Sequence, residues 1–138
     1  MIFKTEAPDH RILWKTMSKH EFDLEQLLSI FRQLTVGVEY MHSKDIIFRD
    51  FHPTRIHMLD GILKWNLVGM PYNFKKLIKD TAFTGHLNYT APELLRDRKG
   101  KLLSPKVDIW SLGCCFFNLV TKRDPFSSAD IAKDTTKI

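Results

Sequence analysis

The stretch IIFRDFHPTRIHMLDGILKWNL, residues 46–67, decides the fold because the periodicity of the chain changes there. Its first three residues form a short apolar run that predicts a strand. Two further short runs, 55–59 and 62–67, are separated only by Asp60-Gly61. An Asp-Gly pair between such runs favours a β-hairpin, because a type I′ turn needs positive φ at both central residues. We therefore expect a small antiparallel hairpin in the middle of the chain.

A long amphipathic helix is expected before this stretch. Asp23 is typical of a helix N-cap, and Gln26 stands three residues later as its capping-box partner. Gly37 lies inside the helical segment and is unfavourable there, which predicts a close packing contact at that position. The apolar residues of the segment recur at steps of three and four, as on one face of a helix: Leu24, Leu27, Leu28, Phe31, Leu34, Val38 and Met41.

Two more helices are expected after the hairpin. Pro92, at a favourable first position, predicts a short helix over 92–96. Residues 107–121 have a helical pattern that is apolar on most sides, which predicts a buried helix with Trp110 in the core. Weaker patterns predict short helices over 11–20 and after Ser127 or Ser128, and loops over 69–89 and 96–106.

The composition is that of one folded, globular domain. The chain has 138 residues, of which 43% are hydrophobic, 12% aromatic and 27% charged, and this excludes a disordered or low-complexity chain. The only cysteines, Cys114 and Cys115, are adjacent, which excludes a disulfide framework and cysteine-based zinc sites. The N-terminus has no apolar signal segment, and the apolar-leaning stretch 109–120 is too short to cross a bilayer. We therefore expect a cytoplasmic protein with no membrane contact.

Four segments, read in order, resemble the C-terminal lobe of a eukaryotic protein kinase. Each motif alone is weak, but the four stand in register and at the right spacing. The resemblance implies an α+β, mainly helical fold with a small hairpin. It implies that residues 1–138 form one partial kinase-like domain, from near the hinge between the lobes to the start of the helix after the buried one, with the N-lobe absent. The segments are IIFRDFHPTRIHML (46–59, catalytic loop), KWNLVG (64–69, where D-F-G would fall), GHLNYTAPELL (85–95, end of the activation segment) and VDIWSLGCCFF (107–117, the D-x-W-S-x-G helix).

The resemblance assigns roles to several polar residues. Asp50 matches the carboxylate that accepts the proton of the substrate hydroxyl. Arg49 matches the arginine that, in many kinases, clamps a phosphate of the activation segment. His52 stands where a lysine steadies the transferring phosphate, and His86 where a hydroxyl residue contacts the catalytic carboxylate. Asp108 matches the buried aspartate that hydrogen-bonds the catalytic-loop backbone.

Three other positions depart from the kinase pattern. Arg55 stands at the Mg²⁺-binding Asn, Leu67 stands at the Mg²⁺-binding Asp, and His57 falls where an apolar side chain packs under adenine. Leucine has no oxygen for a hard cation, and an arginine places positive charge where the metal should bind. We therefore expect no metal site and no cofactor beyond weak, metal-independent ATP binding. A kept scaffold with lost metal positions resembles a pseudokinase.

The first hypothesis is thus a catalytically impaired kinase-like domain that acts through protein–protein contacts, with a separate kinase or N-lobe as a possible partner. The alternative is an active Ser/Thr kinase fragment that transfers phosphate from ATP to protein hydroxyls. It would need Asn66, Asp60 or Asp45 to hold metal in a shifted register. A nucleic-acid-binding fragment is weaker still, because the basic residues of 96–101 have no interleaved aromatics.

Two pairs of reactive side chains have a plain and a functional interpretation. Thr81 and Thr84 lie in the segment that resembles the activation segment. Either is an ordinary loop threonine or a phosphorylation site whose phosphate pairs with Arg49. Cys114 and Cys115 lie inside an apolar helical run, which favours small core residues over redox sensors.

Overall fold

The computed structural model of the protein describes residues 21–59, 62–66, 86–96 and 103–126. This part of the chain is mainly helical and contains one two-stranded antiparallel sheet, so the expected α+β class is confirmed. None of its helices is both long enough and apolar enough to span a bilayer. In chain order the elements are α2 (Leu24–His42), the 3₁₀ turn η1 (Pro53–Arg55), β1 (Ile56–Leu59), β2 (Ile62–Trp65), the 3₁₀ turn η2 (Leu87–Tyr89), α4 (Pro92–Arg96) and α5 (Lys106–Thr121).

Helix α2 begins at the predicted capping box. The amide of Gln26 donates to Asp23 Oδ1 at 2.8 Å, and the amide of Asp23 donates to Gln26 Oε1 at 3.1 Å. Both bonds satisfy N–H groups that the first helical turn leaves without a partner. The helix buries a single stripe of side chains, namely Ile30, Leu34, Val38 and Met41.

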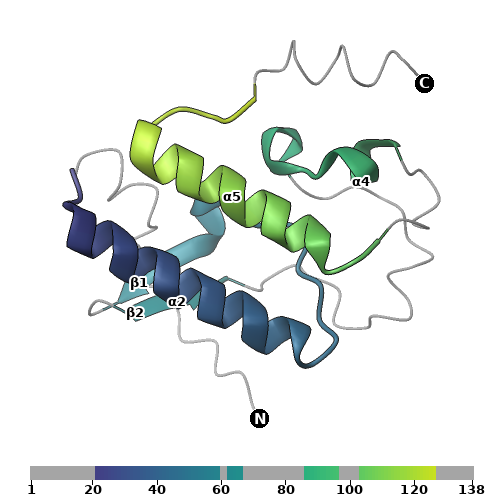
Figure 1. The fold of residues 1–138 in the computed structure, drawn as a ribbon, viewed down its shortest axis with the longest axis horizontal. Helices are drawn as coiled ribbons and strands as arrows, with labels where there is room; N and C mark the ends of the chain where they lie inside the picture. The colour runs from purple at the N-terminus through teal and green to yellow at the C-terminus, as the bar shows by residue number, and fades with distance from the viewer. Residues whose placement is uncertain (1–20, 60–61, 67–85, 97–102, 127–138) are drawn as a thin grey trace.

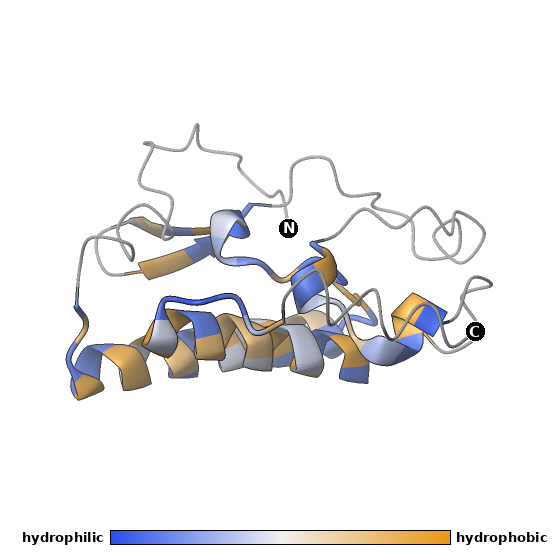
Figure 2. Ribbon diagram, turned by 90° about the horizontal axis from the view of Figure 1, so that it is seen from above, coloured by the Kyte–Doolittle hydropathy of each residue, from blue (hydrophilic) through white to orange (hydrophobic). Residues whose placement is uncertain are grey.

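Helices α2 and α5 lie side by side and run in opposite directions, and the hairpin lies on one side of this helical layer (Figures 1 and 2). Strands β1 and β2 pair in the register Ile56↔Trp65 to Leu59↔Ile62, as the Asp-Gly signal predicts. The core forms where the hairpin, the loop before it and the two helices meet. Its largest fully buried apolar side chains include Phe48, Phe51, Leu34, Ile56 and Leu119.

The hairpin is fixed to α2 by two contacts. A Cβ atom added to Gly37 would lie 2.8 Å from Nε1 of Trp65, so the close packing predicted at this glycine is confirmed. The side chain of Gln33 accepts a hydrogen bond from the amide of Leu63 at 3.0 Å. These contacts place the hairpin against the middle of the long helix.

The prediction that α5 is buried on all sides, with Trp110 in the core, is wrong. Trp110 is 39% exposed, and Ile109, Phe117 and Val120 are exposed as well. Its ring stacks on Phe126, with centroids 5.7 Å apart and planes at 10°. The physical reason is that α5 packs through one face against α2 and η2, and its opposite face is left open in this structure. Apolar residues on all sides of a helix therefore do not show which of its faces are buried.

The predicted strand at 46–48 is also wrong. These residues belong to no strand among the described elements. The amide of Ile46 bonds back to the Met41 carbonyl at 3.0 Å, and the amide of Phe48 bonds to the Asp108 carboxylate. Because these bonds satisfy the backbone, the run needs no neighbouring strand.

Several expectations fall outside the described residues. They are the helices at 11–20 and after Ser127 or Ser128, the Asp60-Gly61 turn itself, Leu67, Thr81 and Thr84. The loops predicted over 69–89 and 96–106 are described only in part.

Candidate functional site

The catalytic-loop backbone is held by Asp108, a fully buried residue in the first turn of α5. Its Oδ2 accepts from the amide of Phe48 at 2.8 Å, and its Oδ1 accepts from the amide of Arg49 at 2.7 Å. Nε2 of His42, at the end of α2, lies 2.8 Å from Oδ2. Burial raises the pKa of Asp108, and these three hydrogen bonds oppose that rise. The expected anchoring of the loop is confirmed.

Arg49 occupies an unusual backbone conformation at the centre of this anchor. Its φ of 63° lies in the left-handed region, which is uncommon for a residue with a Cβ atom. The bond from its amide to Asp108 compensates for the strain. The turn places the rings of Phe48 and Phe51 together in the core, with centroids 4.6 Å apart. Burial lowers the pKa of the Arg49 guanidinium, and Asp108 partly restores it.

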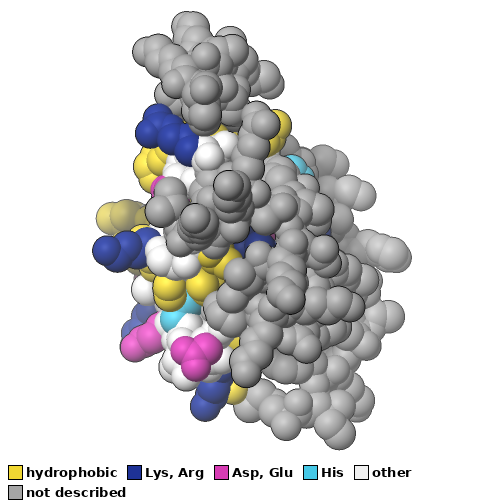
Figure 3. All heavy atoms as spheres, turned by 90° about the vertical axis from the view of Figure 1, so that its right-hand side faces the viewer, with side chains coloured by type: hydrophobic (Ala, Val, Ile, Leu, Met, Phe, Trp, Pro, Cys, Tyr) yellow, Lys and Arg dark blue, Asp and Glu magenta, His cyan; other side chains and the backbone are white. Residues whose placement is uncertain are grey.

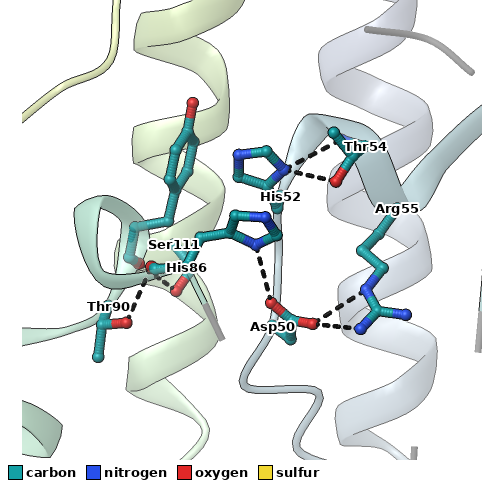
Figure 4. Close-up of polar contacts among 8 residues, drawn as sticks. Asp50, His52, Thr54, Arg55, His86, Thr90 and Ser111 are labelled. Atoms are coloured by element: carbon teal, nitrogen blue, oxygen red, sulfur yellow. Dashed lines mark hydrogen bonds and ion pairs between the residues drawn. The ribbon is translucent and has the colours of Figure 1, made fainter. Parts of the chain in front are cut away.

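Asp50 is paired with Arg55 in the structure. Asp50 is 6% exposed, and Nε and Nη2 of Arg55 both lie 2.9 Å from its Oδ2 (Figure 4). Its other oxygen, Oδ1, is buried without a hydrogen-bond partner. Nδ1 of His86 lies 3.5 Å from Oδ1, a distance that suits an ion pair but is too long for a good hydrogen bond. The carboxylate that resembles a catalytic base thus faces an arginine from its own loop.

His52 lies beside this pair and is stacked on His86. The two rings are 3.5 Å apart and 9° from parallel, and Tyr89 meets the His52 ring edge-on at 4.5 Å. Nδ1 of His52 accepts from the amide of Thr54 at 3.2 Å and lies 2.7 Å from its hydroxyl oxygen. Burial, followed by the neighbouring His86, lowers the pKa of His52 to about 4. His52 is therefore a neutral ring at physiological pH, unlike the lysine it replaces.

His57 lies apart from this cluster, on β1 opposite Lys64. Both of its ring nitrogens are buried and have no hydrogen-bond partner. An imidazole in this state is costly, because its polar atoms have left water without compensation. The structure therefore brings Asp50, His52 and Arg55 together, with His57 on the strand that follows and Leu67 outside the described residues.

The residues of the loop do not fit a divalent metal ion. Mg²⁺ needs oxygen ligands, and the carboxylate of Asp50 already accepts a hydrogen bond from Nε of Arg55 and forms an ion pair with Nη2. A guanidinium beside that carboxylate repels any cation that approaches it. Within the described ranges, no group of three or more His, Cys, Asp or Glu side chains is placed to hold a metal.

Two contacts of the site were missed by sequence reasoning. The motif positions predicted neither the ion pair between Arg55 and Asp50 nor the stack of His86 on His52. The signal for the first contact was present, since Asp50 and Arg55 have opposite charges and lie five residues apart. The second contact, the stack of His52 on His86, joins residues more than thirty positions apart, and no local sequence pattern predicts it.

The chain belongs to the protein kinase family, because the family model described as "Protein kinase domain" matches residues 1–138. It is 31% identical over 137 residues to the SNF-related serine/threonine-protein kinase of Homo sapiens, covering 96% of the chain and 18% of that protein. It is 34% identical over 117 residues to the serine/threonine-protein kinase SSN3 of Eremothecium gossypii, and this match covers 80% of the chain and 20% of that protein. It is 34% identical over 120 residues to the serine/threonine-protein kinase Nek6 of Oryza sativa subsp. japonica, and this match covers 85% of the chain and 21% of that protein. The chain thus spans 18–21% of the length of these relatives.

Proposed function

We propose that this kinase-family domain is catalytically impaired and acts through contacts with other proteins. The observation that carries the proposal is the pair of 2.9 Å contacts between Arg55 and Oδ2 of Asp50. In an active kinase the corresponding carboxylate accepts the substrate hydroxyl, and the residue at the position of Arg55 binds metal. Here the residues at these two positions, Asp50 and Arg55, form an ion pair with each other.

The ion pair impairs catalysis in two ways. A carboxylate oxygen that already accepts a guanidinium N–H and pairs with a second guanidinium nitrogen has less capacity to accept a substrate hydroxyl, which a general base must reach within hydrogen-bond distance. The positive charge of Arg55 also opposes the binding of Mg²⁺ that bridges the ATP phosphates in kinases. Guanidinium groups pair well with phosphate, so a weak and metal-independent contact with ATP fits the same residues.

A protein partner is supported by the exposed apolar side chains. Ile109, Phe117 and Val120 are exposed on α5, and Ile62 is exposed on the hairpin. Figure 3 presents the side that faces right in Figure 1, where hydrophobic side chains reach the surface between basic and acidic ones. A mixed surface of this kind favours a protein over nucleic acid, which selects clustered positive charge. We propose that these protein contacts are made in the cytoplasm and not at a membrane. A separate kinase or N-lobe is the candidate partner.

An active Ser/Thr kinase is the second candidate. Retention of Asp50 and of its Asp108-anchored loop favours it, as do relatives whose names are those of serine/threonine-protein kinases. In this alternative, Arg55 would leave Asp50 when substrate binds.

A phosphate-transfer assay separates the two candidates. The protein is incubated with labelled ATP, Mg²⁺ and a protein substrate such as casein, next to an Asp50→Ala variant and a Glu39→Gln control, whose side chain is exposed on α2. The proposal expects no transfer above the Asp50→Ala background. Transfer that Asp50→Ala abolishes and Glu39→Gln preserves would establish the enzyme instead.

A further inference from the structure

We propose that His52 and His86 form an acid-sensitive clasp that holds the segment 86–90 against the catalytic loop. The clasp is a conformational device that needs no nucleotide and no metal. It goes beyond the proposed function, and it stands whether or not the domain transfers phosphate.

The clasp joins two segments that are distant in the sequence. His52 precedes η1, and His86 precedes η2, yet their rings stack at 3.5 Å and nearly parallel (Figure 4). The edge of Tyr89 closes the same cluster at 4.5 Å from His52. The segment is held on its other side by α5, where the hydroxyl of Ser111 donates to the Tyr89 carbonyl at 2.7 Å. The histidine stack therefore lies at the centre of the side-chain contacts that join segment 86–90 to the loop.

His86 also contacts the carboxylate of the loop. The ring of His86 is 47% exposed, and its Nδ1 lies 3.5 Å from Oδ1 of Asp50, a buried oxygen without a hydrogen-bond partner. A positive charge on His86 would face this carboxylate.

Protonation of both rings opens the clasp. Two imidazolium rings at 3.5 Å repel each other strongly in a partly buried site. A proton on Nδ1 of His52 would also remove the lone pair that accepts from the amide of Thr54. Both effects act against the stacked arrangement, so a doubly charged pair separates.

The other charged groups around His52 set the pH at which this happens. Arg55, from η1, opposes a proton on His52, and Asp124, which follows α5, favours one. Asp50 faces His86 rather than His52. From η2 and α5, Tyr89, Cys114 and Cys115 stay neutral, because burial raises the pKa of each above its usual range.

The sign of the pH effect follows from the lowered pKa of His52. Its pKa is about 4 in the folded protein and near 6.5 in the unfolded chain, so the unfolded state binds more protons between these values. Stability from this residue is present above pH 6.5 and is lost as the pH falls toward 4. We expect the opening of segment 86–90 within this window.

Amide exchange and histidine NMR on the full chain test the clasp. The amides of Tyr89 and Thr90 bond to the carbonyls of His86 and Leu87, so their exchange reports the segment. After correction for the intrinsic rate, their protection should fall by about tenfold between pH 6.5 and pH 4. The α2 amides of Leu34 and Val38 should keep theirs, as a control for global unfolding.

The His86→Phe variant keeps a stacking ring but cannot take a proton. In this variant the protection of Tyr89 and Thr90 should fall less between pH 6.5 and pH 4 than in the unaltered protein, and the titration of the His52 ring should move to higher pH, because the charge of His86 no longer opposes a proton on His52. Two results would overturn the clasp: protection in the unaltered protein that does not change with pH or that falls together with that of α2, and a His52 titration that is the same with and without His86. Should the variant fail to fold, the unaltered protein decides alone, because the clasp requires the protection of Tyr89 and Thr90 to fall with pH while that of α2 persists.

Discussion

Arg55 donates through Nε to one oxygen of Asp50 at 2.9 Å, and its Nη2 forms an ion pair with the same oxygen at 2.9 Å. The 3₁₀ turn η1 brings the two residues together across five positions of the chain. The guanidinium is 27% exposed, whereas the carboxylate is 5% exposed. A partly buried ion pair of this kind contributes to stability, because removing either partner leaves the other charge unpaired and partly out of water.

The first prediction is energetic coupling between these two residues. Asp50→Asn should lower the free energy of unfolding by about 1–3 kcal/mol, because it leaves the arginine unpaired. Arg55→Met should cost about as much or more, since the carboxylate it abandons is the more buried partner. A double-mutant cycle followed by urea denaturation should give a coupling of about 1–2 kcal/mol. A free catalytic carboxylate would give no coupling, and Asp50→Asn would then be neutral or stabilising.

The second prediction concerns the anchor of the loop. Asp108→Asn should cost about 2–4 kcal/mol, because the buried carboxylate accepts two backbone amides and contacts His42, and an amide can replace only part of this. Asp45→Asn is the matched control. Asp45 is exposed with φ of 56°, a conformation that asparagine adopts readily, so its melting temperature should not change. Equal melting temperatures for both variants would refute the anchoring role.

The third prediction uses the two glycines of the helices. Gly37→Ala should destabilise the protein, because its Cβ atom would meet Trp65 at 2.8 Å and the ring is packed between the helix and the core. Gly113→Ala should stabilise it by about 0.5–1 kcal/mol, because the Cβ atom enters open space and alanine favours the helix. Thermal denaturation of both variants measures the contrast. Shifts of the same sign would contradict the packing of the hairpin on α2.

The fourth prediction separates exposed from buried aromatic rings. Phe48→Ala should cost about 3–5 kcal/mol, as expected for a large side chain in a core. Trp110→Ala should cost far less, about 1 kcal/mol, because the ring is 39% exposed and loses mainly its stacking on Phe126. A larger loss at Trp110 than at Phe48, measured by urea denaturation, would show that the tryptophan has a partner in solution.

The sequence predicted those parts of the fold that depend on neighbours along the chain. The capping box at the start of α2, the Asp-Gly signal of the hairpin and Pro92 at the first position of α4 are local features, and each element lies where its signal indicates. The burial of α5 and the pairing of residues 46–48 depend on what packs against them from far away. Periodicity carries no information about such partners, and both predictions were wrong.

The same distinction between local and long-range features holds for the candidate site. The residues themselves were found from motif positions, including Asp50, Arg55 and His52. Their arrangement was not found, because an ion pair across a 3₁₀ turn and a stack between distant histidines depend on side-chain geometry. The kinase pattern showed where this chain departs from its family but not how the departing residues pair with one another.

Titration of ATP in the presence of Mg²⁺ or of EDTA tests the impaired-kinase proposal most directly. Ligand binding to the folded state raises the melting temperature, so thermal shift and calorimetry report affinity under both conditions. The account predicts weak binding that Mg²⁺ does not improve and that Arg55→Met weakens further, because the proposal assigns the contact with phosphate to Arg55. A strong stabilisation that requires Mg²⁺ and survives Arg55→Met would contradict the account and identify a working nucleotide site.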